Sequence, residues 1–322
     1  MNAISDSMES RQWSRRRFVA ASLALAGAAP FARAASRQSV PHSQGEEPPV
    51  LVAPEGACDC HMHIYDPRFA PSPHWKNPPP VAPVSAYRQF QKRIGTSRTV
   101  VVTPSTYGVD NSCTLDALHQ LGDGARGIAV VDADVPDAEL QRLRDGGVVG
   151  LRVNFVSAQS WGTTTPQMLE TLARRVSPLG WHIQVLMNAD QIVAHRAVLE
   201  ALPTPVVFDH LARIPQPAGT SHPAFGVVTG LMRKGRGYVK LSGAYMDTVS
   251  GAPAYADVSA VARAFVDAAP MQVVWGSDWP HPTEKHKPDD AVLFDLLRQW
   301  APDERARRQI LVDTPTRLYQ FA

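Results

Sequence analysis

The chain has 322 residues, of which 19% are charged, and its formal net charge is +2 at pH 7. A balance this close to neutrality provides neither a basic face for nucleic acid nor a strong attraction to a membrane surface, so we expect a small-molecule partner. Only three cysteines are present, and Cys58 and Cys60 are two residues apart on one expected strand. A disulfide-stapled fold is therefore not supported.

The first 35 residues have the features of an export signal. Three consecutive arginines (Arg15, Arg16, Arg17) precede an apolar run over 19–29, and Ala32-Arg33-Ala34 follows as a small-residue cleavage pattern. This pattern resembles a twin-arginine signal cleaved near Ala34. The apolar run is about half as long as a bilayer span requires. We therefore predict export to the periplasm by the twin-arginine machinery, with no membrane span in the mature chain.

The rest of the chain alternates short β-branched runs with segments of helical period. Residues 36–55 are polar and proline-bearing and are predicted to be a linker, which leaves 56–322 as the folded domain. Strands are expected at 57–63, 99–103, 127–131, 148–155, 182–187, 205–209, 238–242 and 272–276. Helices are expected at 85–94, 111–121, 137–144, 165–176, 190–202, 223–233, 255–268 and 289–300. This alternation predicts an α/β fold, a single-domain (β/α)8 TIM barrel. No GxGxxG motif follows the first expected strand, which counts against a dinucleotide-binding fold.

Two histidines close the first expected strand. His61 and His63 are separated by one residue, and the alternation of a strand sends both imidazoles to the same face, towards the mouth of the barrel. Two imidazoles can begin a metal site, and they equally suit polarising a carbonyl or positioning a water molecule. The competing interpretation is an ordinary pair of hydrogen-bonded histidines.

A third histidine and an arginine follow the sixth expected strand. His210 comes directly after residues 205–209, at the same rim of the barrel. Arg213 lies three residues later, in a loop where its guanidinium could take a substrate carboxylate bidentately. The alternative is a structural ion pair between Asp209 and Arg213.

An aspartate follows the eighth expected strand, where an apolar run ends at Gly276 and delivers Asp278 to the rim. A carboxylate held among histidines can accept a proton from water, so Asp278 is a candidate general base. Fixing the loop is its alternative role. Tyr107, after the second expected strand, and His281 are further candidates for lining the pocket, with packing as the alternative for both.

These motifs together resemble the amidohydrolase superfamily, in the amidohydrolase-2 branch that includes the 2-pyrone-4,6-dicarboxylate lactonases. The resemblance extends over nearly all of residues 56–319. It rests on His61-x-His63, on Asp209-His210, on Gly150-Leu151-Arg152-Val153-Asn154-Phe155 and on Trp275-Gly276-Ser277-Asp278-Trp279-Pro280-His281-Pro282.

The resemblance implies hydrolysis of a lactone that carries acidic substituents. Asp278 would activate water, and His61, His63 and His210 would polarise the lactone carbonyl. Positions that hold substrate in this branch correspond to Ser105, Arg152 and Arg213.

Three positions depart from the branch, because Leu186, Ala158 and Met246 stand where the lactonases place a tyrosine and further arginines. Each lost charge-assisted hydrogen bond is worth roughly 1.5 to 3 kcal/mol, so a doubly charged pyrone should bind weakly. A carboxylated or sulfonated ring of the muconolactone type suits the smaller number of cations better.

Metal dependence follows from the same residues. The superfamily commonly holds zinc at these positions, and a metal here would use His61, His63 and Asp278. A typical centre also needs a lysine or another ligand on the middle strands, and Gln184 on the fifth expected strand is a poor substitute. We expect no obligatory metal, with zinc as the alternative.

The sequence therefore predicts a lactone hydrolase of aromatic or sugar-acid catabolism. Two alternatives use the same barrel site, namely a decarboxylase and a lactone isomerase. A third is a periplasmic binding protein that has no catalytic activity, against which the convergence of three histidines and Asp278 on one rim argues.

Overall fold

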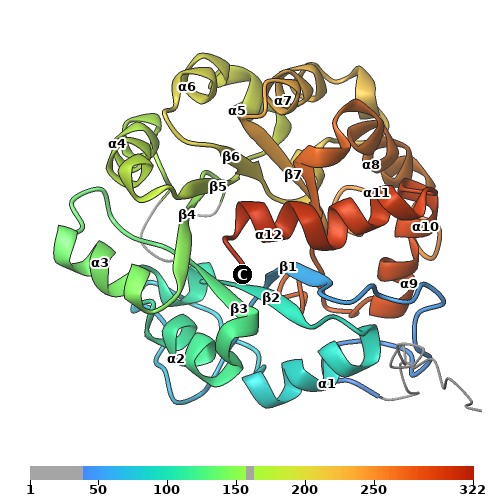
Figure 1. Ribbon diagram of the computed structural model, residues 1–322, viewed down its shortest axis with the longest axis horizontal. Coiled ribbons are helices and arrows are strands. Elements are labelled where there is room, and N and C mark those ends of the chain that lie inside the picture. The colour runs from blue at the N-terminus through green and yellow to red at the C-terminus, as the bar shows by residue number, and fades with distance from the viewer. Residues whose placement is uncertain (1–38, 157–162) are drawn as a thin grey trace, which may run out of the picture. The chain divides into compact units, whose positions relative to one another are not determined.

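The computed structural model describes residues 39–156 and 163–322. Eight parallel strands form one sheet in the order β1 to β8, surrounded by helices (Figure 1). The expected barrel is confirmed, and every expected strand lies within two residues of an observed one. The strands are β1 (Cys58–Met62), β2 (Arg98–Val102), β3 (Ala125–Ala129), β4 (Val148–Asn154), β5 (His182–Leu186), β6 (Val206–Phe208), β7 (Gly237–Leu241) and β8 (Val273–Trp275).

The helices depart from expectation in two places and at the C-terminus. The helix expected at 190–202 divides at His195, whose backbone leaves the helical region (φ −102°, ψ 17°), and the helix expected at 289–300 also divides. The last two helices lie beyond the expected elements. The helices are α1 (Val84–Ile94), α2 (Ser112–Leu121), α3 (Asp137–Asp145), α4 (Pro166–Val176), α5 (Ala189–Ala194), α6 (Arg196–Ala201), α7 (Pro223–Arg233), α8 (Ala256–Ala268), α9 (Asp290–Asp295), α10 (Leu297–Trp300), α11 (Glu304–Arg308) and α12 (Thr314–Leu318).

The barrel is joined between its last and first strands by the segment that follows β8. The backbone N–H of Asp278 donates to the carbonyl of His61 at 2.8 Å, and the N–H of His63 donates to the carbonyl of Trp279 at 2.9 Å. Gly276 permits this approach, because a Cβ there would lie 2.7 Å from the Cβ of His61. The loop after β8 is therefore fixed against the end of β1.

The C-terminal segment closes the opposite end of the barrel. Figure 1 shows α12 lying across the barrel, with the C-terminus at the centre of the view. Arg98, which begins β2, donates to the carbonyl of Ala322 at 3.2 Å, and Tyr319 and Phe321 pack in the inner apolar cluster with Cys58 and Cys60 of β1. Because the amino-terminal ends of the strands are covered in this way, chemistry is confined to their carboxyl ends, as in other barrels.

The described part of the predicted linker, residues 39–55, has neither helix nor strand, but it packs on the barrel. The backbone N–H of Leu51 donates to Asp295 at 2.7 Å, and the indole of Trp279 donates to the carbonyl of Pro41 at 2.8 Å. The predicted export signal lies outside the described residues. Among the helices that the structure describes, none has both the length and the hydropathy to cross a bilayer.

Candidate active site

A local irregularity in β1 turns its histidines into the barrel. The register of β1 with β2 shifts between Asp59 and Met62, which is the signature of a bulge. Cys60 and His61 are consecutive in the strand, so strict alternation would send their side chains to opposite faces. Both contact interior side chains instead, Cys60 in the inner apolar cluster and His61 at Lys240, so the alternation fails here. His61 and His63 still meet as expected, because their Nε2 atoms lie 3.2 Å apart.

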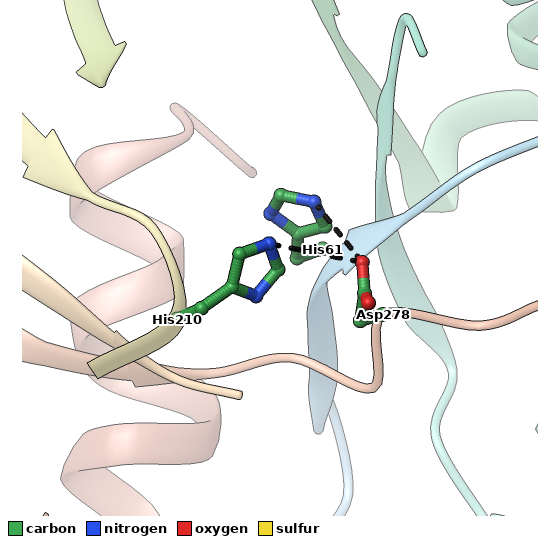
Figure 2. A group of neighbouring side chains, drawn as sticks. All are labelled: His61, His210 and Asp278. Atoms are coloured by element: carbon green, nitrogen blue, oxygen red, sulfur yellow. Dashed lines mark ion pairs between the residues drawn. The ribbon is translucent and has the colours of Figure 1, made fainter. Parts of the chain in front are cut away.

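The four residues expected to carry the chemistry converge on one point. Oδ1 of Asp278 lies 3.6 Å from Nε2 of His61, 3.5 Å from Nε2 of His63 and 3.9 Å from Nε2 of His210. Figure 2 shows His61 and His210 both directed at the Asp278 carboxylate, although His61 lies on β1 and His210 follows β6. All four side chains are at least 96% buried. A single small group, such as a water molecule or a carbonyl oxygen, could contact all of them.

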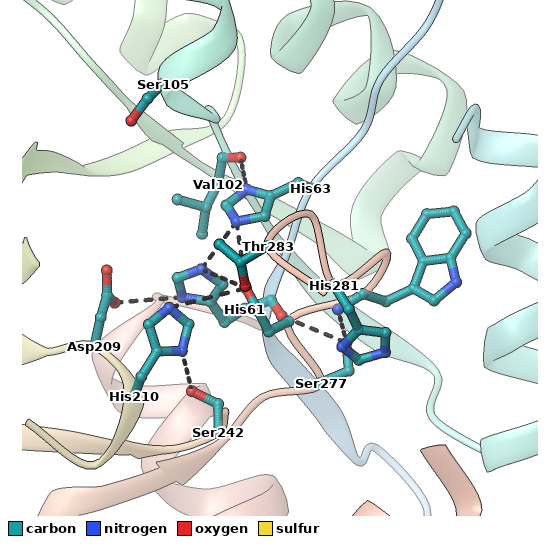
Figure 3. A network of polar contacts seen from close by, with 12 residues as sticks. His61, His63, Val102, Ser105, Asp209, His210, Ser242, Ser277, His281 and Thr283 are labelled. Carbon is teal, nitrogen blue, oxygen red and sulfur yellow. Dashed lines mark hydrogen bonds and ion pairs between the residues drawn. The ribbon is translucent and has the colours of Figure 1, made fainter. Parts of the chain in front are cut away.

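Hydrogen-bond partners of the Nδ1 atoms fix the ring orientations of His63 and His210 (Figure 3). Nδ1 of His63 lies 2.8 Å from the carbonyl of Val102, and Nδ1 of His210 lies 3.0 Å from Oγ of Ser242. A carbonyl can only accept, so Nδ1 of His63 carries a proton, and neutral His63 presents a bare Nε2 to the site. Ser242 directly follows β7 and was not anticipated from the sequence.

Asp59 ties the two halves of the site together, a role that the sequence did not reveal. Its carboxylate accepts hydrogen bonds from the backbone N–H and the hydroxyl of Ser277, from the N–H of His61 and from the hydroxyl of Tyr87, at 2.6 to 3.2 Å. These bonds link β1, the segment after β8 and helix α1. Removing this carboxylate would take an acceptor from the backbone N–H groups of His61 and Ser277, whereas the hydroxyls of Tyr87 and Ser277 have second acceptors in Thr99 and in the carbonyl of His61.

A buried charge cluster lies beneath the histidines. Nε of Arg152 donates to Oδ2 of Asp209 at 2.9 Å, and Nζ of Lys240 lies 3.2 Å from Oδ1 of the same carboxylate. Burial opposes ionisation of Asp209, but Lys240, His61 and Arg152 outweigh it and hold its pKa well below the usual range. Burial lowers the pKa of Lys240, and Asp209 opposes that shift. Arg152, expected to hold substrate, is thus already paired.

Lys240 is the residue that sequence reasoning missed. A typical metal centre would need a lysine or another ligand on the middle strands, where we noted only Gln184. Lys240 lies instead on β7, and its Nζ atom contacts that same glutamine at 2.5 Å. A signal was available in the sequence. A charged residue at the fourth position of the short strand Gly237–Leu241, two residues before Ser242, shares the interior face of a barrel strand with it.

The environment favours an ionised base among neutral imidazoles. Burial acts to raise the pKa of Asp278, but the imidazoles of His210, His63 and His61 outweigh it and lower that pKa well below its usual range. Burial lowers the pKa of His210 to about 4. Burial and the charge of Lys240 also lower the pKa of His61. At neutral pH, therefore, Asp278 is a carboxylate, and His61 and His210 are neutral.

Tyr245 and His281 lie behind Asp278 and support its carboxylate. The hydroxyl of Tyr245 donates to Oδ2 of Asp278 at 2.6 Å and lies 2.9 Å from Nδ1 of His281. Nε2 of His281 lies 3.1 Å from the carboxylate of Asp290, and His281 is fully buried. His281 was expected to line the pocket. Both nitrogens of its ring are occupied within the protein, which places it as a support for Tyr245.

The remaining expected substrate residues surround the mouth. Ser105 follows β2, its hydroxyl accepts from the side chain of Asn154 at 3.1 Å, and Figure 3 shows it beyond Val102, apart from the histidines. The hydroxyl of Tyr107 accepts from the backbone N–H of Asp66 at 3.1 Å. Of the three departures from the lactonase branch, Leu186 ends β5 and Met246 follows β7, while Ala158 lies outside the described residues.

Three of the side chains have the spacing of a metal site. His61, His210 and Asp278 each offer a ligand atom within 4.8 Å of the others, so His210 joins this group in place of the expected His63. The protons do not suit a metal, however. Nζ of Lys240 lies 2.7 Å from Nδ1 of His61. With Lys240 as the donor, Nε2 of His61 keeps the ring proton that a metal would have to replace, so the spacing of these residues suits a divalent ion but this proton arrangement does not.

Arg213 pairs with Asp247 and not with Asp209, which the sequence offered as its alternative partner. It donates bidentately to Asp247, from Nε at 2.7 Å and from Nη2 at 2.9 Å, while Asp209 pairs with Arg152. The Arg213 side chain is 25% exposed, so it still reaches solvent at the mouth. Its charge is largely neutralised by Asp247, and this reduces what it can contribute to binding an anion.

We predict that Asp247→Asn strengthens the binding of an acidic lactone. The variant frees the Arg213 guanidinium, and one recovered charge-assisted hydrogen bond should lower KM by about tenfold with little change in kcat. Steady-state kinetics with anionic and neutral lactones would measure this. Glu139→Gln, which breaks the exposed Glu139 to Arg142 pair on α3, is the matched control. An unchanged or higher KM in Asp247→Asn would show that Arg213 does not face the substrate.

Comparison with known proteins agrees with this geometry. A family model for amidohydrolases matches residues 58–321. The chain is 36% identical over 282 residues to 2-pyrone-4,6-dicarboxylate hydrolase of Comamonas testosteroni, covering 84% of this chain and 92% of that protein. It is 34% identical over 275 residues to 4-sulfomuconolactone hydrolase of Hydrogenophaga intermedia (84% and 90% covered) and 28% identical over 274 residues to D-galactarolactone isomerase of Agrobacterium fabrum (84% and 92% covered). The chain therefore belongs to the amidohydrolase family, as its motifs predicted.

Proposed function

We propose that this protein hydrolyses a small lactone that carries an anionic substituent. The observation that carries the proposal is the convergence of His61, His63 and His210 on one oxygen of Asp278, at 3.5 to 3.9 Å, with a buried charge cluster beneath them. Two relatives with 34% and 36% identity are hydrolases of acidic lactones, which supports the same substrate class. The product would be a hydroxy acid, suited to further catabolism of aromatic or sugar-acid compounds.

The mechanism follows from the protons of the site. A water molecule held by Asp278 attacks the carbonyl carbon of the lactone, and Asp278 takes the proton that the water loses. Negative charge develops on the carbonyl oxygen, where Nε2–H of His61 donates to it. His210 donates from Nε2 as well when the Ser242 hydroxyl gives its proton to Nδ1 of that ring. The ring C–O bond then breaks, and the ring oxygen leaves with the proton from Asp278. Before the lactone binds, Nε2 of His63 accepts the Nε2 proton of His61; this proton turns to the carbonyl oxygen of the lactone when charge develops there.

We further propose that this reaction needs no resident metal. Family members often bind a metal, and here the His61, His210 and Asp278 group has the spacing for one. The Lys240 contact to Nδ1 of His61 leaves a donor, and not a lone pair, directed at the site. Hydrogen-bond donors aimed at the developing oxyanion supply stabilisation of the kind that a Lewis acid would otherwise give.

We predict that Asp278→Asn abolishes most of the turnover. An amide cannot take the proton from water, so kcat should fall by about 10²- to 10⁴-fold while the fold is retained. The assay follows acidic lactones in ¹⁸O-labelled water by mass spectrometry, so that hydrolysis appears as the gain of one labelled water. Asp134→Asn, at an exposed aspartate, is the control. Undiminished turnover in Asp278→Asn would contradict the mechanism.

Isomerisation of a lactone is the second candidate, because one relative is D-galactarolactone isomerase. The same labelled-water assay distinguishes the two reactions. An isomerase returns a product of unchanged mass, whereas a decarboxylase releases carbon dioxide. A ligand that binds tightly without any change in mass would instead support a binding protein.

We also propose export to the periplasm by the twin-arginine route, which rests on the sequence of residues 1–35. We predict that replacing Arg15 and Arg16 together with lysine retains the uncleaved precursor in the cytoplasm. Cell fractionation and N-terminal sequencing would test this, with Arg17→Lys as the matched control and a mature N-terminus near Ala34 in the unaltered protein. Equal export of the double variant would contradict the proposal.

A further inference from the structure

Lys240 lies at the centre of the barrel, directly beneath His61, and its side chain has no exposed surface. Its Nζ atom is within hydrogen-bond distance of two side chains, at 2.7 Å from Nδ1 of His61 and 2.5 Å from Oε1 of Gln184. Oδ1 of Asp209 lies 3.2 Å away as an ion-pair partner without the geometry of a hydrogen bond. An ammonium group has N–H donors and no lone pair, so it can only donate to these neighbours.

The position of the His61 proton follows independently from the other side of the ring. Nδ1 of His63 donates to the carbonyl of Val102, so neutral His63 has a bare Nε2. Nε2 of His61 lies 3.2 Å from that nitrogen and 3.6 Å from the Asp278 carboxylate. Both neighbours can accept a proton from Nε2. Nδ1 also faces an acceptor, Oδ1 of Asp209 at 3.3 Å, but the Lys240 ammonium lies closer, at 2.7 Å, and this donor places the single proton of neutral His61 on Nε2. Nδ1 of His61 is then bare and accepts from Lys240.

The proton assignments form one directed chain. Lys240 donates to His61, His61 donates to His63, and His63 donates to the carbonyl of Val102. Its direction is set at both ends, by an ammonium that can only donate and by a carbonyl that can only accept. Reversing the His61 proton would place two donors against each other across the 2.7 Å contact with Lys240.

We propose that Lys240 is a positioning residue that fixes His61 as an Nε2–H donor and thereby keeps divalent cations off this site. A metal at Nε2 of His61 needs the proton moved to Nδ1, where an acceptor would have to receive it. Asp209 Oδ1, 3.3 Å from Nδ1, is such an acceptor, and carboxylates perform this task behind metal-bound histidines. Lys240 occupies that nitrogen and also binds that carboxylate.

The catalytic value of the Nε2–H donor rests on the proposed function, but the proton position and the cation exclusion do not. Lys240→Met removes the donor and retains the apolar stem. His61 can then turn its proton towards Asp209, which keeps its partner Arg152. Such a side chain behind a ligand typically changes metal affinity by about 10- to 100-fold, so the variant should bind zinc more tightly by that factor.

The experiment uses the full chain with ¹⁵N-labelled histidine. Long-range ¹H–¹⁵N spectra report which nitrogen of each neutral ring carries the proton, and the signal missing from His61→Gln identifies His61. Calorimetric titration with zinc alone gives the affinity. Lys287→Met is the matched control, because Lys287 donates to the backbone carbonyls of His281 and Glu284 and not to a ring nitrogen.

We expect the His61 proton on Nε2 in the unaltered protein and in Lys287→Met, and on Nδ1 in Lys240→Met, with tighter zinc binding only in the last. A proton on Nδ1 in the unaltered protein overturns the proposal, and this result is available even if Lys240→Met does not fold. Unchanged zinc affinity in a folded Lys240→Met overturns the cation exclusion. Neither readout uses turnover, so failure of the lactonase proposal is detected separately.

Discussion

The site depends on the hydrogen bonds between β1 and the segment that follows β8. The backbone N–H of Asp278 donates to the carbonyl of His61, and the N–H of His63 donates to the carbonyl of Trp279. The Asp59 carboxylate also accepts hydrogen bonds from Ser277. Together these bonds hold Asp278 against the two histidines of β1. Asp278 adopts a left-handed backbone conformation (φ 62°), which residues other than glycine rarely occupy without support. The hydrogen-bonded loop provides this support and fixes the carboxylate relative to His61.

The second constraint is electrostatic. Asp209, Arg152 and Lys240 are almost entirely removed from solvent, and buried charges are costly unless they are paired. Here the cluster also acts on the layer above it, because its lysine contacts a histidine of the site. The ion pair between Asp209 and Lys240 is thus coupled to the position of the ring proton of His61. A substitution in the cluster should therefore move that proton.

The alternation of strand-like and helical segments predicted all eight strands to within two residues. It also placed His61 and His63 at the end of the first expected strand and His210 and Asp278 after the sixth and eighth, and the structure brings these four side chains together. Strand alternation alone predicted that the His61 side chain faces the barrel interior, but a bulge in β1 also contributes to this orientation. Pairings across the barrel were not predictable. Arg213 with Asp247 and Lys240 with Asp209 join segments whose register only the closed barrel defines.

The ends of the helices and the C-terminal segment that closes the opposite end of the barrel could not be predicted from the sequence either. The break at His195 leaves no mark in the periodicity of residues 190–202, and helices α11 and α12 are too short for a period to be recognised. The role of Asp59 depends on donors from three separate segments, so its neighbours along the chain do not reveal it.

The central claim is that hydrogen-bond donors and Asp278 suffice for catalysis without a metal. The most direct measurement determines the metal content and the rate of acidic lactone hydrolysis on the same sample, before and after treatment with a chelator. We expect an unchanged rate in protein that holds no stoichiometric metal. A rate that disappears with the metal and returns in proportion to added zinc would contradict it.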